Sequence, residues 1–337
     1  MLITCRSIVF IHGFTGHPKD TWTLPPSSTR SRGSALRPTL TFRRSSSTVN
    51  SFESGRAEVY WPRDVLPQTA PNARILTYGY DTRIRHLAQN PVSQNSIHDH
   101  GWNFLCAVEE VRSGEPSRPL LLVAHSLGGL VVKEALRRSR DRRSAKRHVK
   151  SIVGVLFFGT PHRGANPLFQ SLVHRVLIQL IKYIAGVRFN ESIVHDLMPG
   201  EHLKEMRDEF IRLARWRRWT VYCFQEEYGV RQLSNRKVST PWSAFDVLQL
   251  TVKVVEDESS RLDDPTIETT RHISKNHMNM CRFSGTEDSE YRKVAAAIEK
   301  VLTEKISRKF FSKEWFRTIL RVVVNGHWKR DGLTEVC

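Results

Sequence analysis

Cysteine is scarce and scattered in this sequence. The chain has 337 residues but only five cysteines, and no two of them stand in a Cys-x-x-Cys spacing. An odd and dispersed set of this kind argues against a disulfide scaffold or a zinc ribbon, and it suits a reducing compartment. The sequence also has no run of about 18 apolar residues, so we expect no transmembrane helix.

Two further absences narrow the function classes. The first residues lack the order of basic region, apolar stretch and small-residue cleavage site, so we expect no secretory signal. No Gly-x-x-x-x-Gly-Lys-Ser/Thr phosphate-binding loop occurs, so ATP hydrolysis is not predicted. Hydrophobic residues make up 39% of the chain, which is enough for a substantial core and excludes a wholly disordered protein.

Basic residues outnumber acidic ones by 52 to 34, which gives a formal net charge of +18. Most of this excess lies in the segments 23–58, 137–150 and 305–337, and the rest of the chain is close to neutral. A basic patch attracts phosphates of any origin. Because the charge is confined to appendage-like segments, we expect no nucleic-acid partner.

Strands and helices alternate along the chain. Short apolar, β-branched runs predict strands, and segments with helical periodicity predict helices between them. The predicted strands cover residues 7–11, 73–78, 120–124, 151–158, 219–224 and 250–255, and the predicted helices cover 96–112, 128–138, 167–185, 201–215, 289–303 and 305–324. This alternation predicts an α/β fold with a mostly parallel sheet covered by helices on both faces.

The segment 23–58 interrupts the pattern. It is rich in Ser, Thr, Arg and Pro, with few large apolar residues and no periodicity, so we interpret it as a disordered insertion. The predicted organisation is one domain built from residues 1–22 and 59–303, followed by a basic amphipathic helix and tail over 304–337. Such a helix can lie on an anionic membrane surface; the alternative is a helix that packs on the domain or links it to a partner.

A buried strand that ends in a serine and continues as a helix predicts a nucleophile. Residues 120–129 read Leu-Leu-Leu-Val-Ala-His-Ser-Leu-Gly-Gly. On such a tight turn, Ser126 would point its Oγ out of the sheet, where a histidine can reach it. The N–H of Leu127, at the helix N-terminus, could then donate to an oxyanion. Gly128 supplies the small residue that this crowded turn needs, whereas Ala124 stands where the Gly-x-Ser-x-Gly pattern has its first glycine.

A glycine-rich loop follows the first predicted strand. Residues 10–16 read Phe-Ile-His-Gly-Phe-Thr-Gly. Such a loop can aim a second N–H, from Phe14 or Thr15, at the same oxyanion. The loop and the serine turn together predict the two halves of an oxyanion hole.

Six segments together resemble one known family. They are VFIHGFTGHPKDTW at 9–22, WPRDVLP at 61–67, ARILTYGYD at 73–81, VAHSLGGLVVKEAL at 123–136, FFGTPHRGA at 157–165 and NHMNMCRF at 276–283. They are similar to α/β-hydrolase proteins of the serine-active-site-containing, lipase-like family, which is widespread in fungi, and more distantly to GPI inositol-deacylase-like lipases. The resemblance covers most of residues 7–303, but neither the insertion nor the tail.

This resemblance implies an α/β-hydrolase with a Ser-His-acid triad, no cofactor and no metal. It assigns the histidine to His277 in the last matching segment, and His272 is the alternative. The family order along the chain is serine, acid, histidine. Because His162 precedes every acid candidate, we interpret it as a loop-shaping residue, and His12 likewise.

Three carboxylates could complete the triad. Glu226 and Glu227 follow the strand predicted at 219–224, at the carboxyl edge where catalytic groups of open α/β sheets lie. The resemblance favours Glu226. Asp257, after the next predicted strand, is the alternative acid.

These residues predict a serine hydrolase that cleaves a carboxylic ester through an acyl-enzyme. The alternatives are an acyltransferase with the same triad and a catalytically silent signalling or membrane-binding module of the same fold. The resemblance implies a hydrophobic ester or lipid as substrate. It also implies an intracellular location, either cytoplasmic or peripheral on mitochondrial or endoplasmic-reticulum membranes.

Overall fold

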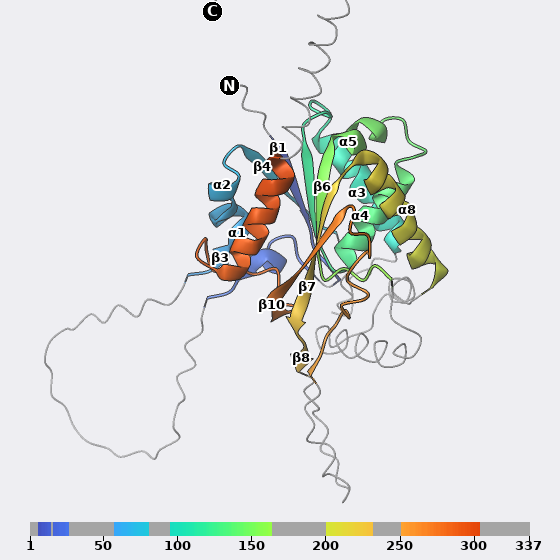
Figure 1. Cartoon of the computed structure of the whole chain (residues 1–337). Helices are drawn as coiled ribbons and strands as arrows, with labels where there is room; N and C mark the ends of the chain where they lie inside the picture. Colours follow the sequence, from blue (N-terminus) through green and yellow to red (C-terminus); the bar gives the residue numbers. More distant parts are fainter. Residues whose placement is uncertain are drawn as a thin grey trace, which may run out of the picture.

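Six parallel strands form the central sheet of the protein (Figure 1). The computed structural model describes residues 6–14, 16–26, 57–80, 95–163, 200–231 and 251–303. From edge to edge the strands are Glu268–Asn276 (β10), Thr220–Tyr228 (β7), Ile152–Phe158 (β6), Leu120–His125 (β5), Arg6–Ile11 (β1) and Ala73–Tyr78 (β4). The predicted parallel α/β sheet is confirmed, and all six carboxyl ends lie at the same edge.

The centre of the sheet is buried on both faces. Every residue of β5 and β6 is buried. Along β1, Ile8 and Phe10 pack into one core cluster, whereas Val9 and Ile11 pack into the other. Because successive side chains of a strand point to opposite faces, a strand between two helical layers must be apolar throughout.

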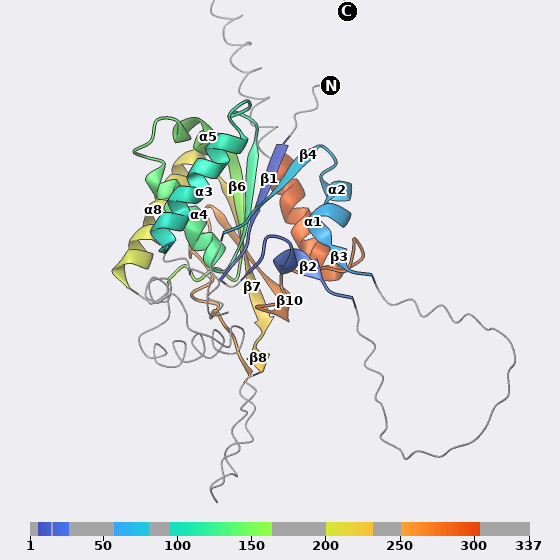
Figure 2. The same ribbon diagram turned by 180° about the vertical axis from the view of Figure 1, so that it is seen from behind.

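Helices cover both faces of the sheet (Figures 1 and 2). One layer contains α3 (Ile97–Val111), α4 (Leu127–Arg138), α5 (Ala145–Ser151) and α8 (Glu201–Arg217). The other contains α1 (Trp61–Asp64), α2 (Leu66–Thr69) and a helix over residues 289–303. The helices predicted at 96–112, 128–138, 201–215 and 289–303 are confirmed to within two residues.

Gly154 in β6 marks a close approach between layers. A Cβ there would lie 2.6 Å from Cγ1 of Val301 and would also meet the carbonyl oxygen of Thr220, which is fixed in the neighbouring β7. We expect Gly154→Ala to lower the free energy of unfolding by about 1–3 kcal/mol, measured by urea denaturation. Gly114→Ala is the matched control because no atom lies within 4 Å of its added Cβ. Equal stability of the two variants would contradict the prediction.

The strand predicted at residues 250–255 does not belong to the main sheet, so this prediction is wrong. Of its described residues 251–255, only Thr251–Val252 (β9) form a strand, which pairs antiparallel with Val230–Arg231 (β8) outside the sheet. The sixth strand of the sheet is β10, which the sequence pattern does not predict. Ile273 is its only buried residue, because β10 lies at the edge of the sheet and carries mostly polar side chains.

The start of the predicted insertion is also wrong by a few residues. Thr23–Leu24 (β2) pairs antiparallel with Val59–Tyr60 (β3), so the chain is still ordered at residue 23. Thr23 is buried, and its hydroxyl donates to the carbonyl of Lys19 at 2.9 Å. Four predictions lie outside the described residues, namely the rest of the insertion over 27–56, the helices at 167–185 and 305–324, and the tail. Within the described part of the chain, no helix has both the length and the apolar character needed to cross a membrane.

Candidate active site

Ser126 lies on a sharp turn between β5 and α4. Its backbone has φ 51° and ψ −122°, a left-handed conformation that is strained for a residue with a side chain. The turn is held because the N–H of Ser126 donates to the carbonyl of Phe158 at 2.8 Å. The helix begins at the next residue, Leu127. This strand–serine–helix turn, on a six-stranded parallel sheet, confirms the α/β-hydrolase fold.

Two glycines allow the loop after β1 to pack directly on this turn. A Cβ on Gly13 would lie 2.8 Å from the Cβ of Ser126. A Cβ on Gly128 would meet the carbonyl oxygens of His12 and Ile11, the latter at 2.6 Å. Because these neighbours include backbone atoms of β1 and its loop, only glycine fits at Gly128 without displacing the turn at Ser126.

Glu226 and His277 lie together at the carboxyl ends of neighbouring strands. Glu226 is in β7, opposite Ile273 of β10, and His277 directly follows β10. Glu226 Oε2 accepts the backbone N–H of His277 at 2.9 Å, and Oε1 lies 3.6 Å from its Nδ1. Oε1 also accepts the N–H of Val255 at 2.6 Å. Both side chains are at least 95% buried, so the pair is shielded from water.

The other two acid candidates are engaged elsewhere. Asp257 lies 3.4 Å from Nε2 of His272 and accepts hydrogen bonds from Lys253 at 2.7 and 2.8 Å. Glu227 accepts a hydrogen bond from the hydroxyl of Ser274 at 2.5 Å. The alternative acid and the alternative histidine therefore pair with each other at the surface, and the structure puts Glu226 beside His277.

A turn at the end of β6 connects the serine with the histidine. Phe158, whose carbonyl holds Ser126, is followed by Gly159 with φ 53°. A Cβ on Gly159 would lie 2.9 Å from both Cε1 and Nδ1 of His277. The imidazole thus packs on the same turn that fixes the serine, which brings both groups to one place at the edge of the sheet.

His125, the last residue of β5, supports His277 from the serine side. Its ring lies 4.9 Å from the ring of His277, and its Nε2 is 3.0 Å from the carbonyl oxygen of His277. Since a carbonyl can only accept, Nε2–H of His125 is the donor. Burial holds the pKa of His125 well below its ordinary value, so the ring stays neutral. His277 is therefore held at its N–H by Glu226 and at its C=O by His125.

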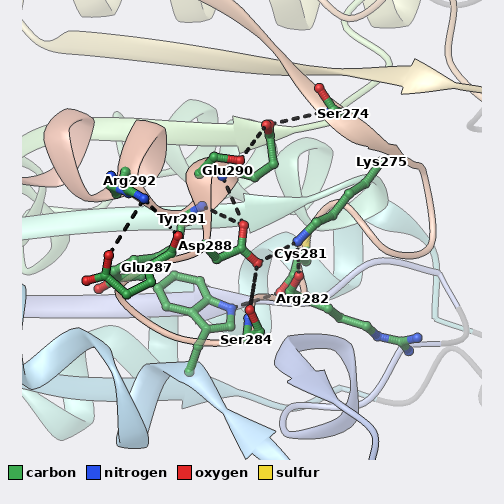
Figure 3. A network of polar contacts seen from close by, with 12 residues as sticks. Ser274, Lys275, Cys281, Arg282, Ser284, Glu287, Asp288, Glu290, Tyr291 and Arg292 are labelled. Atoms are coloured by element: carbon green, nitrogen blue, oxygen red, sulfur yellow. Dashed lines mark hydrogen bonds and ion pairs between the residues drawn. The ribbon is translucent and has the colours of Figure 1, made fainter. Parts of the chain in front are cut away.

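The segment around His277 is also fixed by the start of the last described helix (Figure 3). The N–H of Ser274 donates to Glu290 Oε2 at 2.9 Å, and Lys275 Nζ contacts Asp288 Oδ2 at 3.1 Å. Asp288 in turn accepts the N–H of Glu290 at 3.0 Å, as an N-cap residue does. The position of the histidine is thus set by several elements rather than by its own loop alone.

The predicted oxyanion donors are only partly described. Leu127 is buried at the start of α4, where the first N–H groups have no partner within the helix. Phe14 is partly buried and packs on the cluster that contains Leu127, whereas Thr15 lies outside the described residues. His12 stacks on Tyr80 at 4.4 Å between ring centroids and shapes this loop.

No protein-family model matches the chain. Protein SERAC1 of Mus musculus is 24% identical over 280 residues, which cover 82% of this chain and 36% of that protein. Protein SERAC1 of Danio rerio is 27% identical over 241 residues, covering 65% of this chain and 30% of the relative. The chain is a distant homologue of SERAC1.

The chain thus spans about a third of the length of the SERAC1 proteins that it matches. Among solved structures, the mature lipase BlEst2 of Bacillus licheniformis is 13% identical, with a TM-score of 0.45. That match covers 82% of this chain and 86% of the lipase.

The sequence reasoning missed His125 as part of the site. A usable signal exists, because a histidine at the end of the uninterrupted apolar run 120–124 must be buried and needs a partner.

In the described parts of the chain, no group of three or more His, Cys, Asp or Glu side chains could hold a metal ion.

Proposed function

We propose that this protein is a serine hydrolase that cleaves a carboxylic ester through a Ser126–His277–Glu226 triad. The observation that supports it best is the strained turn at Ser126 beside a buried histidine–carboxylate pair. A serine becomes nucleophilic when a histidine can take its proton and a carboxylate orients that histidine. These three residues follow one another along the chain in the order serine, acid, histidine, as in the α/β-hydrolase fold.

The proposed reaction has two halves. Ser126 Oγ attacks the ester carbonyl carbon while Nε2 of His277 takes the hydroxyl proton. The tetrahedral intermediate then collapses, and the imidazolium returns the proton to the leaving alcohol. Water, deprotonated by the same imidazole, attacks the acyl carbon; the imidazolium then protonates Ser126 Oγ as the carboxylic acid leaves. Glu226 keeps the proton of His277 on Nδ1 and stabilises the imidazolium.

The oxyanion would be held by the N–H of Leu127 and by an N–H of the loop at Phe14 or Thr15. Donors of this kind stabilise negative charge that develops only in the transition state. The proposed substrate is a hydrophobic ester such as a lipid. Peripheral membrane association stays a prediction from the sequence.

A fluorophosphonate probe tests the proposal directly, because it reacts covalently only with an activated serine. We expect stoichiometric labelling of the purified protein, with the adduct mapped by mass spectrometry to the peptide that contains Ser126. Incubation with a p-nitrophenyl acyl ester, with and without a long-chain alcohol, then separates hydrolysis from acyl transfer by the products formed. A folded protein that stays unlabelled would favour the catalytically silent module instead.

Substitution of His125 tests how the histidine is positioned. We expect His125→Leu to lower kcat about 10- to 100-fold with a smaller change in KM, because the carbonyl of His277 loses its donor and the imidazole shifts. His125→Gln should restore most of the activity, since its amide N–H can reach the same carbonyl. Equal losses in both variants, matched by equal losses of stability, would point to a merely structural role.

A further inference from the structure

A second group of buried polar side chains lies behind the serine turn, on the face of the sheet that α4 and α8 cover. Within the described part of the chain, five side-chain atoms there are buried without a hydrogen-bond partner. They are Lys133 Nζ, Thr160 Oγ1, His162 Nδ1, Arg207 Nε and Ser259 Oγ. Buried polar groups are nearly always satisfied, so five such atoms in one region require a bound water or ion as a partner. We call these residues the donor cluster.

Three members of the donor cluster, Lys133, Thr160 and His162, lie around the ring of Phe157 in β6. Lys133 Nζ lies 5.8 Å from the ring centroids of both Phe157 and Phe210. The ring of His162 lies 4.8 Å from that of Phe157, edge to face. Thr160 fills the space left by the missing side chain of Gly129, one helical turn before Lys133.

The last two members of the cluster reach the same region from other elements. The carbonyl of Ser259 accepts the backbone N–H of His162 at 2.6 Å. Arg207 of α8 contributes to the electrostatic environment of both Lys133 and His162. The cluster thus joins α4, the loop after β6, the loop around Ser259 and α8.

The members of the cluster share one property: each can donate a hydrogen bond. Lysine and arginine can only donate, and the hydroxyls can orient their protons. His162 has its Nε2 3.4 Å from the thiol of Cys223, so an anion would select the tautomer with the proton on Nδ1.

Acceptors nearby are already occupied. The carboxylate of Glu268 accepts the backbone N–H groups of Leu262 and Asp264, at 2.8 and 3.5 Å. Asp208 pairs with Arg207 at 3.0 Å. Arg207 also donates through Nη2 to the carbonyl of Leu262, so only its Nε is left without an acceptor. The other four donor atoms have no acceptor among the described residues.

We propose that the donor cluster binds a small monovalent anion, namely chloride. A monatomic ion suits the site because Lys133, Thr160, His162 and Ser259 are all at least 93% buried. A phosphate would need more room, and its dehydration would cost more free energy. Bound chloride would tie α4, which starts at the nucleophile, to α8 and to the loop after β6. This proposal does not depend on the hydrolase chemistry of Ser126.

The protonation of Lys133 predicts how chloride binding varies with pH. Burial lowers its pKa to about 7. The groups that face it are Cys223 on β7, Arg207 and Asp208 on α8, and Glu268 on β10. His162 stays neutral because burial holds its pKa well below the ordinary value. An anion prefers the ammonium form of the lysine, so we expect chloride to bind more tightly at pH 6 than at pH 9.

Urea unfolding of the full chain at constant ionic strength tests the proposal, with sodium chloride progressively replacing sodium gluconate. Once chloride exceeds its Kd, the apparent unfolding constant should fall about tenfold for each tenfold rise in chloride. Lys133→Met should abolish this dependence, and Thr160→Val, which keeps the shape of the side chain, should weaken it. Lys146→Met, at an exposed position of α5, is the matched control and should keep the full effect.

Two results would overturn the proposal. One is an unfolding constant of the wild-type protein that is the same in chloride and in gluconate. The other is a chloride dependence that persists in Lys133→Met. If Lys133→Met does not fold, an unchanged chloride dependence in both Thr160→Val and Ser259→Ala would contradict the proposal equally.

Discussion

Ser126→Ala should lower kcat for ester hydrolysis by about 10⁶-fold and abolish fluorophosphonate labelling. The hydroxyl is the only group that the substitution removes, and the acyl-enzyme cannot form without it. The main-chain bond from Ser126 to Phe158 remains, so the turn should keep its shape. Initial rates on a p-nitrophenyl ester give the ratio of the two kcat values. The assay must detect rates as low as that of the uncatalysed hydrolysis.

The control for this variant is Ser139→Ala, at the other end of α4. The hydroxyl of Ser139 donates to the carbonyl of Leu136 at 2.6 Å, at the opposite end of α4 from the turn at Ser126. We expect this variant to keep the wild-type kcat and the wild-type labelling. Since Ser126 and alanine have similar strain at φ 51°, the free energy of unfolding of Ser126→Ala should stay near that of the wild type. Turnover that survives in Ser126→Ala would assign the chemistry to another residue.

The central part of the fold could be predicted from the sequence because its signal is unambiguous. A strand such as 120–124, apolar at every position, has no stable place except between two helical layers. The edge strand β10 gives no such signal, since three of its central residues are exposed and only Ile273 is buried. Residues 254–255 are apolar for another reason: they are buried in an irregular segment whose backbone is held by Glu226.

The strand–serine–helix turn at Ser126 could also be predicted, whereas the position of the candidate acid depends on strand register. Glu226 and Glu227 are neighbours on one strand, so their side chains point to opposite sides. Only the pairing of Ile273 with Glu226 decides that Glu226 faces His277 while Glu227 reaches Ser274. That register is a long-range property of β7 and β10, and no local pattern in the sequence encodes it.

The donor cluster also could not be predicted from a local pattern in the sequence. Lys133 occupies a helical position that would ordinarily be a solvated face, and His162 lies in a loop. Their burial follows from the packing of α8 against α4, which buries Phe210 beside Phe157. The burial of such isolated polar residues is therefore visible only once the packing of the helices on the sheet is known.

Glu226→Gln should lower kcat by about 10⁴-fold, the second-largest effect that we expect. The carboxylate accepts the N–H groups of Val255 and His277 and faces Nδ1 of the imidazole. An amide has a single acceptor oxygen, so its NH₂ must face either a backbone donor or Nδ1. In the second case it stabilises the tautomer with the proton on Nε2, which cannot take the proton of the serine hydroxyl.

The matched control is Asp257→Asn, which removes the negative charge of the alternative acid. Because Asp257 pairs with Lys253 and His272 at the surface, we expect kcat to change less than threefold. Urea unfolding of both variants separates a loss of activity from a loss of stability. In Glu226→Gln, an amide NH₂ that faces a backbone N–H should lower the free energy of unfolding by about 1–3 kcal/mol. If Asp257→Asn loses activity and Glu226→Gln retains it, then Asp257 orients the catalytic histidine. The buried pair of Glu226 and His277 would then serve only to hold β10 on β7.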